Sequence, residues 1–271
     1  MINALTFDLE DWFCVHYLEH TIKEEWDKCE QRAARNTKTI LDLLDKHNVK
    51  ATFFVLGWIA ERIPDLIREI DICGHEVATH GYSHTLLTRM TPESFEEDLT
   101  KAIKVTEVCM NQSILGFRAP AFSITNSNFW TLDVLIKKGI KYDSSIFPID
   151  FHPDYGVPNG LLSIYQIRDS LIEVPLSCVE VLGKRLPCSG GAYFRMFPYP
   201  LSKLLLRKCN SQDRPFIFYL HPWEIDPELP RLSLSWFTRF RYYHNLDKTL
   251  KKLDSLLKDF QFTSIKSILG L

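Results

Sequence analysis

The stretch Glu76-Val-Ala-Thr-His-Gly-Tyr-Ser-His84 joins a short apolar run to two imidazoles that are four residues apart. Gly74 ends a preceding helical pattern, and residues 76–79 are then predicted to form a brief extended segment that leads into His80. On a helical turn this spacing places both rings on one face, where they can bind a single metal ion. The stretch therefore predicts a strand followed by a candidate metal site.

The same order of elements recurs along the chain, with apolar runs typical of strands between segments whose apolar residues have helical spacing. Strands are predicted at residues 5–7, 49–56, 76–79, 114–117, 140–142, 161–167, 171–174, 216–220 and 262–265. Helices are predicted at residues 36–47, 64–73, 91–110, 126–138, 201–209 and 245–260, and Gly190-Gly191 is predicted to be a turn. This alternation favours an α/β barrel with a parallel sheet, whose active site is formed by the loops after the strands.

Length and composition favour one large unit. A chain of 271 residues with 45% apolar side chains can bury a large core. We predict a single domain over residues 1–271, with a core at about 3–224 and a C-terminal extension at about 225–271. The formal net charge is −2, and basic and acidic residues are mixed, which argues against a nucleic-acid partner.

The cysteines and the N-terminal sequence bear on the cellular compartment of the protein. Seven scattered cysteines, none in a CxxC pair, argue against a disulfide framework and favour a reducing environment. The chain shows neither a signal-peptide pattern nor an apolar run of 18 residues. We therefore expect a cytoplasmic protein without a transmembrane segment, with peripheral contact at the inner face of the membrane left open. The sequence carries no signal for an oligomeric state.

Polar residues follow five of the predicted strands at the point where each strand ends. These residues are Asp8, His80, Arg118, Asp143 and His221. Because the carboxyl ends of parallel strands meet at one edge of a sheet, all five can project into the same mouth despite their separation in sequence.

Taken together, these residues resemble the ordered motifs of the polysaccharide deacetylases, the NodB-homology domain of carbohydrate esterase family 4. The motifs are Thr6-Phe-Asp8, Gly74-His-Glu76, His80-Gly-Tyr-Ser-His84, Arg118-Ala-Pro120 and Leu220-His221. Two further stretches, Gly190-Gly-Ala-Tyr-Phe-Arg195 and Arg241-Tyr-Tyr-His-Asn245, resemble a subfamily found in bacterial exopolysaccharide loci. The resemblance implies a distorted (β/α) barrel of about seven strands, here with a helical and aromatic C-terminal extension.

The resemblance also implies a divalent metal, zinc with cobalt or nickel as alternatives, held by two histidines and one acidic residue. His80 and His84 match the histidine ligands. The family usually has two adjacent aspartates, whereas here one leucine separates Asp8 from Glu10 and Asp11. Strand alternation favours Glu10 as the ligand, whereas a turn after the strand favours neither, so both acids remain candidates.

The remaining roles follow from the same resemblance. Asp8 matches the catalytic base, and Arg118 matches the arginine that orients this base and keeps it ionised. His221 matches the general acid and is expected to face the metal ligands across the barrel mouth. The backbone N–H of Ala121 matches the donor to the oxyanion. Asp143 matches the family's fourth motif without its tryptophan, and it either positions His221 or has a structural role.

Other aromatic and histidine side chains are secondary candidates. Aromatics near the strand ends can stack on sugar rings or pack the core, and these are Trp12, Phe122, Tyr193 and Trp223. We expect surface or packing roles for His16, His20, His47, His75, His152 and His244. Residues 236–244 mix aromatics with arginines; we expect them to pack on the barrel, with glycan binding or membrane contact as alternatives.

These features predict a metal-dependent N-deacetylase. Its substrate is expected to be an N-acetylated sugar of a cell-surface or exported polysaccharide or its precursor, met as a cytoplasmic intermediate either with or without a lipid carrier. The alternatives are hydrolysis of another small amide or imide by the same residues, and a non-catalytic glycan-binding role.

Overall fold

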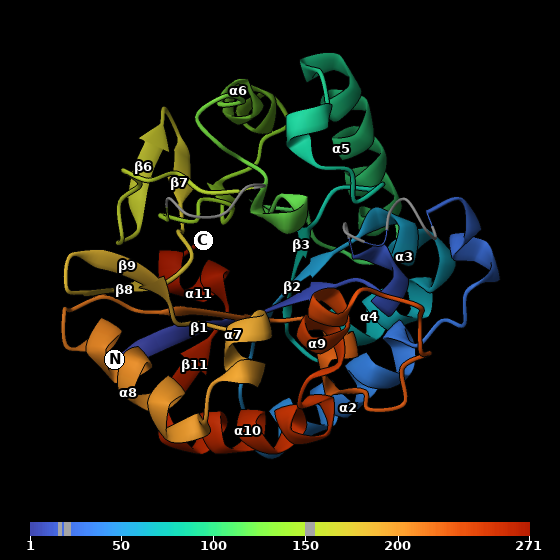
Figure 1. Ribbon diagram of the computed structural model, residues 1–271. Helices are drawn as coiled ribbons and strands as arrows, with labels where there is room; N and C mark the ends of the chain where they lie inside the picture. Colours follow the sequence, from blue (N-terminus) through green and yellow to red (C-terminus); the bar gives the residue numbers. More distant parts are fainter. Residues whose placement is uncertain (16–17, 19–22, 150–154) are drawn as a thin grey trace.

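The structure is a computed structural model that describes residues 1–15, 18, 23–149 and 155–271. Its centre is a curled nine-stranded sheet with the order β10-β1-β2-β3-β4-β5-β7-β6, in which β11 also pairs with β1 (Figure 1). The strands are β1 (Ile2–Leu9), β2 (Thr52–Val55), β3 (Glu76–Thr79), β4 (Gly116–Phe117), β5 (Tyr142–Asp143), β6 (Tyr165–Arg168), β7 (Leu171–Glu173), β10 (Ile217–Leu220) and β11 (Gln261–Thr263). All recorded pairings in this sheet are parallel except that of β6 with β7.

Helices lie around the outside of the sheet (Figure 1). They are α2 (Ala33–Lys46), α3 (Gly57–Arg62), α4 (Pro64–Ile72), α5 (Pro92–Glu107), α6 (Trp130–Lys137), α7 (Gly191–Met196), α8 (Tyr199–Asn210), α9 (Trp236–Tyr243), α10 (Leu246–Asp259) and α11 (Ile265–Leu269). A separate hairpin is formed by β8 (Cys178–Val181) and β9 (Lys184–Pro187). Among the helices of the described residues, none has both the length and the apolar character needed to cross a bilayer.

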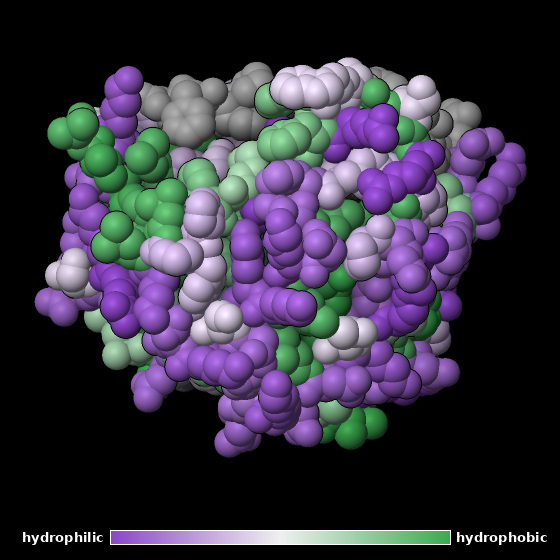
Figure 2. Space-filling view, turned by 60° about the horizontal axis from the view of Figure 1, so that its bottom comes forward, coloured by the Kyte–Doolittle hydropathy of each residue, from purple (hydrophilic) through white to green (hydrophobic). Residues whose placement is uncertain are grey.

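Capping residues and apolar stripes in the sequence explain where the helices begin and which side of each helix is buried. Thr91 caps α5 by accepting a hydrogen bond from the N–H of Ser94, and Pro92 occupies the first helical position. Helix α10 buries Leu246, Leu253 and Leu256. The face to which α8 and α10 contribute is mostly hydrophilic (Figure 2), as expected when the apolar stripes turn inward.

The expected fold class is confirmed, including the helical C-terminal part. The nine strand segments predicted from the sequence correspond to the nine strands of this sheet. The family resemblance alone implied about seven strands; the antiparallel β6 extends one edge of the sheet, and β11 pairs with the first residues of β1. The expected turn at Gly190-Gly191 is instead the start of α7. Gly190 (φ 114°) pairs with Tyr219 of β10, and a Cβ on it would lie 1.9 Å from the Tyr219 carbonyl oxygen, so glycine is required here.

Packing of residues 236–244 on the barrel is observed only in part. Tyr242 is buried, and its hydroxyl donates a hydrogen bond to the carbonyl of Trp12. Trp236, Phe237 and Phe240 are exposed. The segment is a helix fixed on one side and open on the other.

The register of the sheet determines which residues leave it together. Leu9, Val55, Thr79 and Phe117 form one row across four neighbouring strands. The next positions in three of these strands are Glu10, His80 and Arg118. On the other side of β1, Phe7 pairs with Leu220, so His221 follows at the level of Asp8. In-register parallel pairing thus brings side chains from four strands to one edge of the sheet.

Candidate metal and acid–base site

A cleft of about 710 Å³, including its open mouth, lies at this edge of the sheet. Eight of the ten predicted site residues line it: Asp8, Glu10, His80, His84, Ala121, Tyr193, His221 and Trp223. Of the other two, Arg118 is fully buried and bonded to Asp8, whereas Asp11 faces away from the cleft.

Glu10, His80 and His84 form a compact buried cluster. Their potential ligand atoms all lie within 4.8 Å of one another, and His84 Nε2 is 2.7 Å from Glu10 Oε2. The two histidines are in a loop after β3, not on the expected helical turn; Gly81 and His84 have φ values of +73° and +55°. Asp98 of α5 holds this loop by accepting hydrogen bonds from the N–H groups of Tyr82 and Ser83.

The hydrogen bonds and charges of this cluster fit a bound metal ion. His80 Nδ1 lies 2.8 Å from the carbonyl oxygen of Arg118, so it carries the proton and leaves the lone pair on Nε2. Burial lowers the pKa of His80 to about 4, which keeps this ring neutral. Burial alone would raise the pKa of Glu10, but His84 and His221 outweigh it and lower that pKa to about 2. A neutral imidazole and an ionised carboxylate are the forms that bind zinc-like ions.

Asp11 is a structural residue in this arrangement. Its carboxylate accepts hydrogen bonds from the N–H groups of Trp12, Arg32 and Ala33 at 2.8, 2.7 and 2.9 Å. Asp8 and Glu10 line the cleft, whereas Asp11 bonds to backbone on the other side. The structure therefore supports Glu10, not Asp11, as the acidic member of the cluster.

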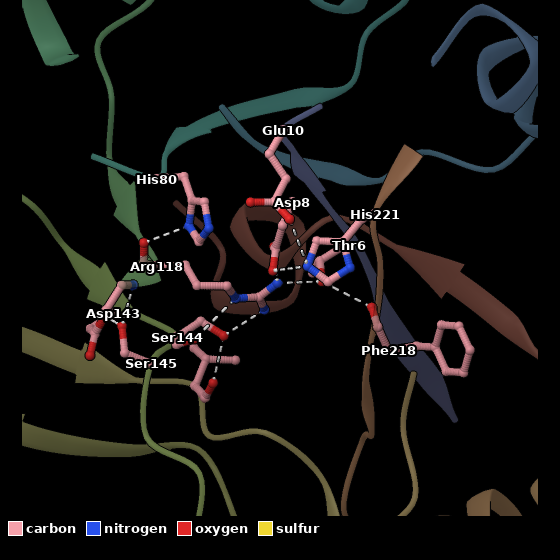
Figure 3. Close-up of polar contacts among 12 residues, drawn as sticks. Thr6, Asp8, Glu10, His80, Arg118, Asp143, Ser144, Ser145, Phe218 and His221 are labelled. Atoms are coloured by element: carbon pink, nitrogen blue, oxygen red, sulfur yellow. Dashed lines mark hydrogen bonds and ion pairs between the residues drawn. The ribbon is translucent and has the colours of Figure 1, made fainter. Parts of the chain in front are cut away.

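Asp8 and Arg118 form a buried ion pair beneath the cleft. Arg118 Nη1 donates to Asp8 Oδ1 at 2.6 Å and to Thr6 Oγ1 at 2.8 Å (Figure 3). Its remaining nitrogens donate to the carbonyl and hydroxyl oxygens of Ser144. This arrangement fixes the Asp8 carboxylate and leaves Oδ2 toward His221, whose Nε2 is 3.9 Å away.

His221 is positioned by Glu224, a residue to which we assigned no role from the sequence. Glu224 Oε1 lies 2.6 Å from His221 Nδ1, and Glu224 Oε2 accepts a hydrogen bond from Arg195 Nε at 2.6 Å. Arg195 donates its other hydrogen bonds to the backbone carbonyls of residues 241, 242 and 244. The three-residue spacing from His221 to Glu224 was visible in the sequence, but the partnership with Arg195 was not.

The charges around His221 favour its protonated form. Burial alone would lower the pKa of His221, but the carboxylates of Glu10, Glu224 and Asp8 outweigh this and raise it to about 9. The expectation that His221 faces the ligands across the mouth is wrong. Strand β10 is the direct neighbour of β1, and His221 Nε2 is only 3.5 Å from Glu10 Oε1.

The suggested contact between Asp143 and His221 is not observed. Asp143 accepts a hydrogen bond from Ser145 and lies at the far side of Arg118 from His221 (Figure 3). Burial raises the pKa of Asp143 to about 6. The position that orients His221 is occupied by Glu224 instead, because Glu224 follows the same strand end as His221.

Ala121 lies at the cleft in a left-handed conformation, with φ 50° and ψ 28°. It belongs to a short 3₁₀ helix, Pro120–Phe122. Among the described residues, no acceptor is found for its backbone N–H. A strained backbone with a free donor at a cleft fits the expected oxyanion contact.

The aromatic candidates differ in what they can contact. Tyr193 and Phe122 line the cleft, whereas Trp12 does not and donates from Nε1 to the carbonyl of Glu30. Trp223 lines the cleft but is 3% exposed, with its ring stacked on His221 and Tyr242. Its Nε1 donates to Glu10 Oε1 at 3.2 Å, so it supports Glu10 and has no free face for a sugar.

The other histidines do not join the site where the structure describes them. His75 accepts a hydrogen bond from the N–H of Ala51, and His47 contacts Asp254. His244 contacts Asn245. His16, His20 and His152 lie outside the described residues.

Comparison with known proteins identifies the family. A parallel α/β sheet that carries a cluster of two histidines and one carboxylate beside an aspartate and a further histidine is an arrangement typical of hydrolytic sites. A family model described as polysaccharide deacetylase matches residues 4–142, more than half of the chain. A second model, described as a domain of unknown function (DUF3473), matches residues 144–270. The chain belongs to the polysaccharide deacetylase family.

Curated relatives are similar to the first part of the chain. A peptidoglycan deacetylase of Helicobacter pylori is 34% identical over 116 residues, covering 43% of this chain and 39% of the relative. A chitooligosaccharide deacetylase of Bradyrhizobium is 39% identical over 100 residues, covering 36% of this chain and 43% of that relative. The matched stretches thus span about two fifths of the length of these relatives.

Solved structures show the same fold over nearly the whole chain. A protein of Mycobacterium smegmatis described as a polysaccharide deacetylase has a TM-score of 0.62 at 21% identity, with 99% of this chain and 90% of that chain covered. A carbohydrate esterase family 4 pseudoenzyme of Bacillus anthracis has a TM-score of 0.52 at 16% identity, with 99% and 65% covered. At these identities the likeness establishes the fold alone.

Proposed function

We propose that this protein is a metal-dependent hydrolase that removes N-acetyl groups from an N-acetylated sugar of a cell-surface or exported polysaccharide or its precursor. The observation that carries the proposal is the Glu10–His80–His84 cluster, which lies directly beside Asp8 and His221 in one cleft. Deacetylases of peptidoglycan and chitooligosaccharides among the relatives support the substrate class.

Glu10, His80 and His84 would hold the metal ion. Two imidazoles and one carboxylate leave positions open for water and substrate, and zinc, cobalt or nickel suits such a set. When bound, the ion would acidify a water molecule and polarise the carbonyl of the acetamido group.

Asp8 is the general base of the proposed reaction. Its Oδ1 is held by Arg118, so Oδ2 is the oxygen that accepts a proton from the attacking water. As the water oxygen bonds to the carbonyl carbon, negative charge develops on the carbonyl oxygen. The N–H of Ala121, which lines the same cleft, can donate a hydrogen bond to that oxygen.

His221 is the general acid. An amine is a poor leaving group unless its nitrogen is protonated when the C–N bond breaks. The negative charges around His221 keep the imidazolium form available, and its Nε2 points to the cleft while Nδ1 is held by Glu224. Transfer of the Nε2 proton to the sugar nitrogen gives acetate and a free amino sugar.

We also propose where the protein acts and in what form it meets its substrate: in the cytoplasm, on a sugar that is attached to a lipid carrier. All seven cysteines are free thiols, which supports a reducing compartment such as the cytoplasm. A lipid-linked precursor is the form of the substrate that we propose for this compartment. The two stretches similar to the exopolysaccharide subfamily support an exported polysaccharide. One of them contains Arg195, which anchors the partner of the proposed acid.

Metal analysis joined to acetate release tests the proposal. The purified protein is expected to contain about one equivalent of a divalent metal. It should release acetate and an equal amount of free amine from N-acetylglucosamine oligomers, with loss on chelation and recovery on adding Zn²⁺, Co²⁺ or Ni²⁺. Acetate release that persists after complete metal removal would contradict the metal-dependent mechanism. Metal binding without hydrolysis of any N-acetyl sugar would favour the glycan-binding alternative.

A further inference from the structure

Helix α9 presents an apolar surface that the proposed reaction does not use. Trp236, Phe237 and Phe240 are 79%, 65% and 43% exposed, and we call them the α9 aromatic face. Other highly exposed apolar residues, such as Ile72 and Leu182, lie on other elements. Single exposed apolar side chains are common, whereas several large ones within one short helix mark an interaction surface.

The rest of the helix is firmly attached to the protein. Tyr242 is fully buried and stacks on Trp223 at 4.9 Å. Arg195 of α7 donates hydrogen bonds to the carbonyls of Arg241 and Tyr242, and α7 and α9 lie side by side (Figure 1). The aromatic face is therefore the outer side of an anchored helix.

The segment that carries the face is basic. Residues 231–244 include Arg231, Arg239 and Arg241 and contain no Asp or Glu, although the whole chain has a net charge of −2. Arg231 and Arg239 are exposed. Exposed tryptophan and phenylalanine flanked by arginine are typical of helices that lie in the headgroup region of a bilayer.

We propose that the α9 aromatic face docks on a bilayer containing anionic phospholipids. The aromatic rings would enter the boundary between headgroups and acyl chains, and the arginines would pair with lipid phosphates. A glycan is a poorer match, because the hydroxyls at the start of this helix are already engaged: Ser235 Oγ and Thr238 Oγ1 are hydrogen-bonded to each other at 2.8 Å. Phe237 and Phe240 have no polar atom for a sugar.

This orientation would serve the proposed function. Arg241, in the same helix as the aromatic face, lines the cleft. Docking through α9 would therefore bring the cleft close to the lipid headgroups, where a lipid-linked sugar is presented. This last step rests on the proposed deacetylase function, whereas the docking itself does not.

Vesicle co-sedimentation tests the docking. The full chain is mixed with phosphatidylcholine vesicles that either contain or lack phosphatidylglycerol. We expect binding to the anionic vesicles that weakens in high salt. The double variant Trp236→Ser/Phe237→Ser should bind roughly tenfold more weakly, and Arg239→Glu should lose a similar factor on anionic vesicles only. Phe240 is left in place because it packs on His244.

Leu182→Ser is the matched control, because Leu182 is 99% exposed but lies in the hairpin β8–β9. It should bind like the unchanged protein, and all variants should keep the same melting temperature. Hydrolysis of a soluble, short N-acetyl oligosaccharide should be the same in the double variant and in the unchanged protein.

Several outcomes would overturn the proposal. One is no binding of the unchanged protein to anionic vesicles, and another is equal loss in Leu182→Ser and in the double variant. A dimer in light scattering that the double variant dissociates would make the face a self-association surface, and retention on a soluble polysaccharide lost in that variant would make it a glycan site. Vesicle binding is measured without any substrate turnover. The docking proposal can therefore hold when the protein releases no acetate, and it can fail when the protein does release acetate.

Discussion

The contact between Glu224 and His221 leads to the sharpest prediction. The perturbation is Glu224→Gln, which keeps the shape of the side chain and removes its charge. Glu224 and Arg195 have side chains 1% and 2% exposed, and Glu224 lies 2.6 Å from both Arg195 Nε and His221 Nδ1. Removing one partner of a buried ion pair costs about 3–5 kcal/mol, because the other charge stays buried. For a chain of this size that corresponds to a fall in melting temperature of roughly 10 °C.

The effect on rate follows from the proposed role of His221 as the general acid. A positioned general acid is worth about 10²–10⁴-fold, so we expect kcat on an N-acetyl sugar to fall by about 10² with KM and metal content little changed. The loss should be much smaller on 4-nitrophenyl acetate, because nitrophenolate leaves without a proton. The assay compares both substrates below the melting temperature of the variant.

Glu228→Gln is the control, since that side chain is 73% exposed and is only 3.5 Å from Arg35 at the surface. It should leave both rates and the melting temperature unchanged. Equal losses on the amide and the ester in Glu224→Gln would refute the reasoning, because a purely structural role damages both reactions alike. Full amide activity in that variant would refute it as well.

The remaining predictions concern the metal, the base and a buried histidine. His84→Ala should lose bound metal as measured by elemental analysis, whereas Asp11→Asn should keep it and instead lower the free energy of unfolding by about 1–3 kcal/mol; metal loss in Asp11→Asn alone would reverse our ligand assignment. Asp8→Asn should retain metal and reduce kcat by about 10²–10⁴-fold, and an undiminished rate would exclude Asp8 as the base. Burial lowers the pKa of His75 to about 4, so the unfolded chain binds the extra proton between that value and its ordinary value of 6.5. The free energy of unfolding should therefore rise with pH between these two values, and it should rise less in His75→Gln. Identical pH dependences of the free energy of unfolding in the two proteins, measured by urea titration, would contradict this prediction.

Much of the core could be predicted because its signals are local. Glycine after helical patterns, the Thr91-Pro92 cap and apolar runs between them indicated most strands and helices of the sheet to within a few residues. Short elements such as α3, α7 and the hairpin β8–β9 were missed, since their sequences have little periodicity. Helix α7 is fixed by a tertiary contact, the pairing of Gly190 with Tyr219.

The candidate site likewise has a part that the sequence predicts and a part that it does not. The residues at strand ends could be found because a parallel sheet brings such positions to one edge. The sequence could not decide between Glu10 and Asp11, because it does not show in which direction each of two adjacent side chains points once the chain has left the strand. The sequence favours Asp143 over Glu224 as the partner of His221 through the family resemblance alone, because it does not show which carboxylate reaches the imidazole.

The sequence by itself determined the order of strands and helices, and with them the presence of His80, His84, Asp8 and His221 at or just after the ends of parallel strands. These depend on local propensity and on spacing along the chain. Only the tertiary structure decided that Glu10 completes the cluster, that Glu224 and Arg195 hold His221, and that α9 exposes its aromatic residues. Each of these depends on which side chains meet across elements far apart in sequence, and that is set by packing and by the burial of charge.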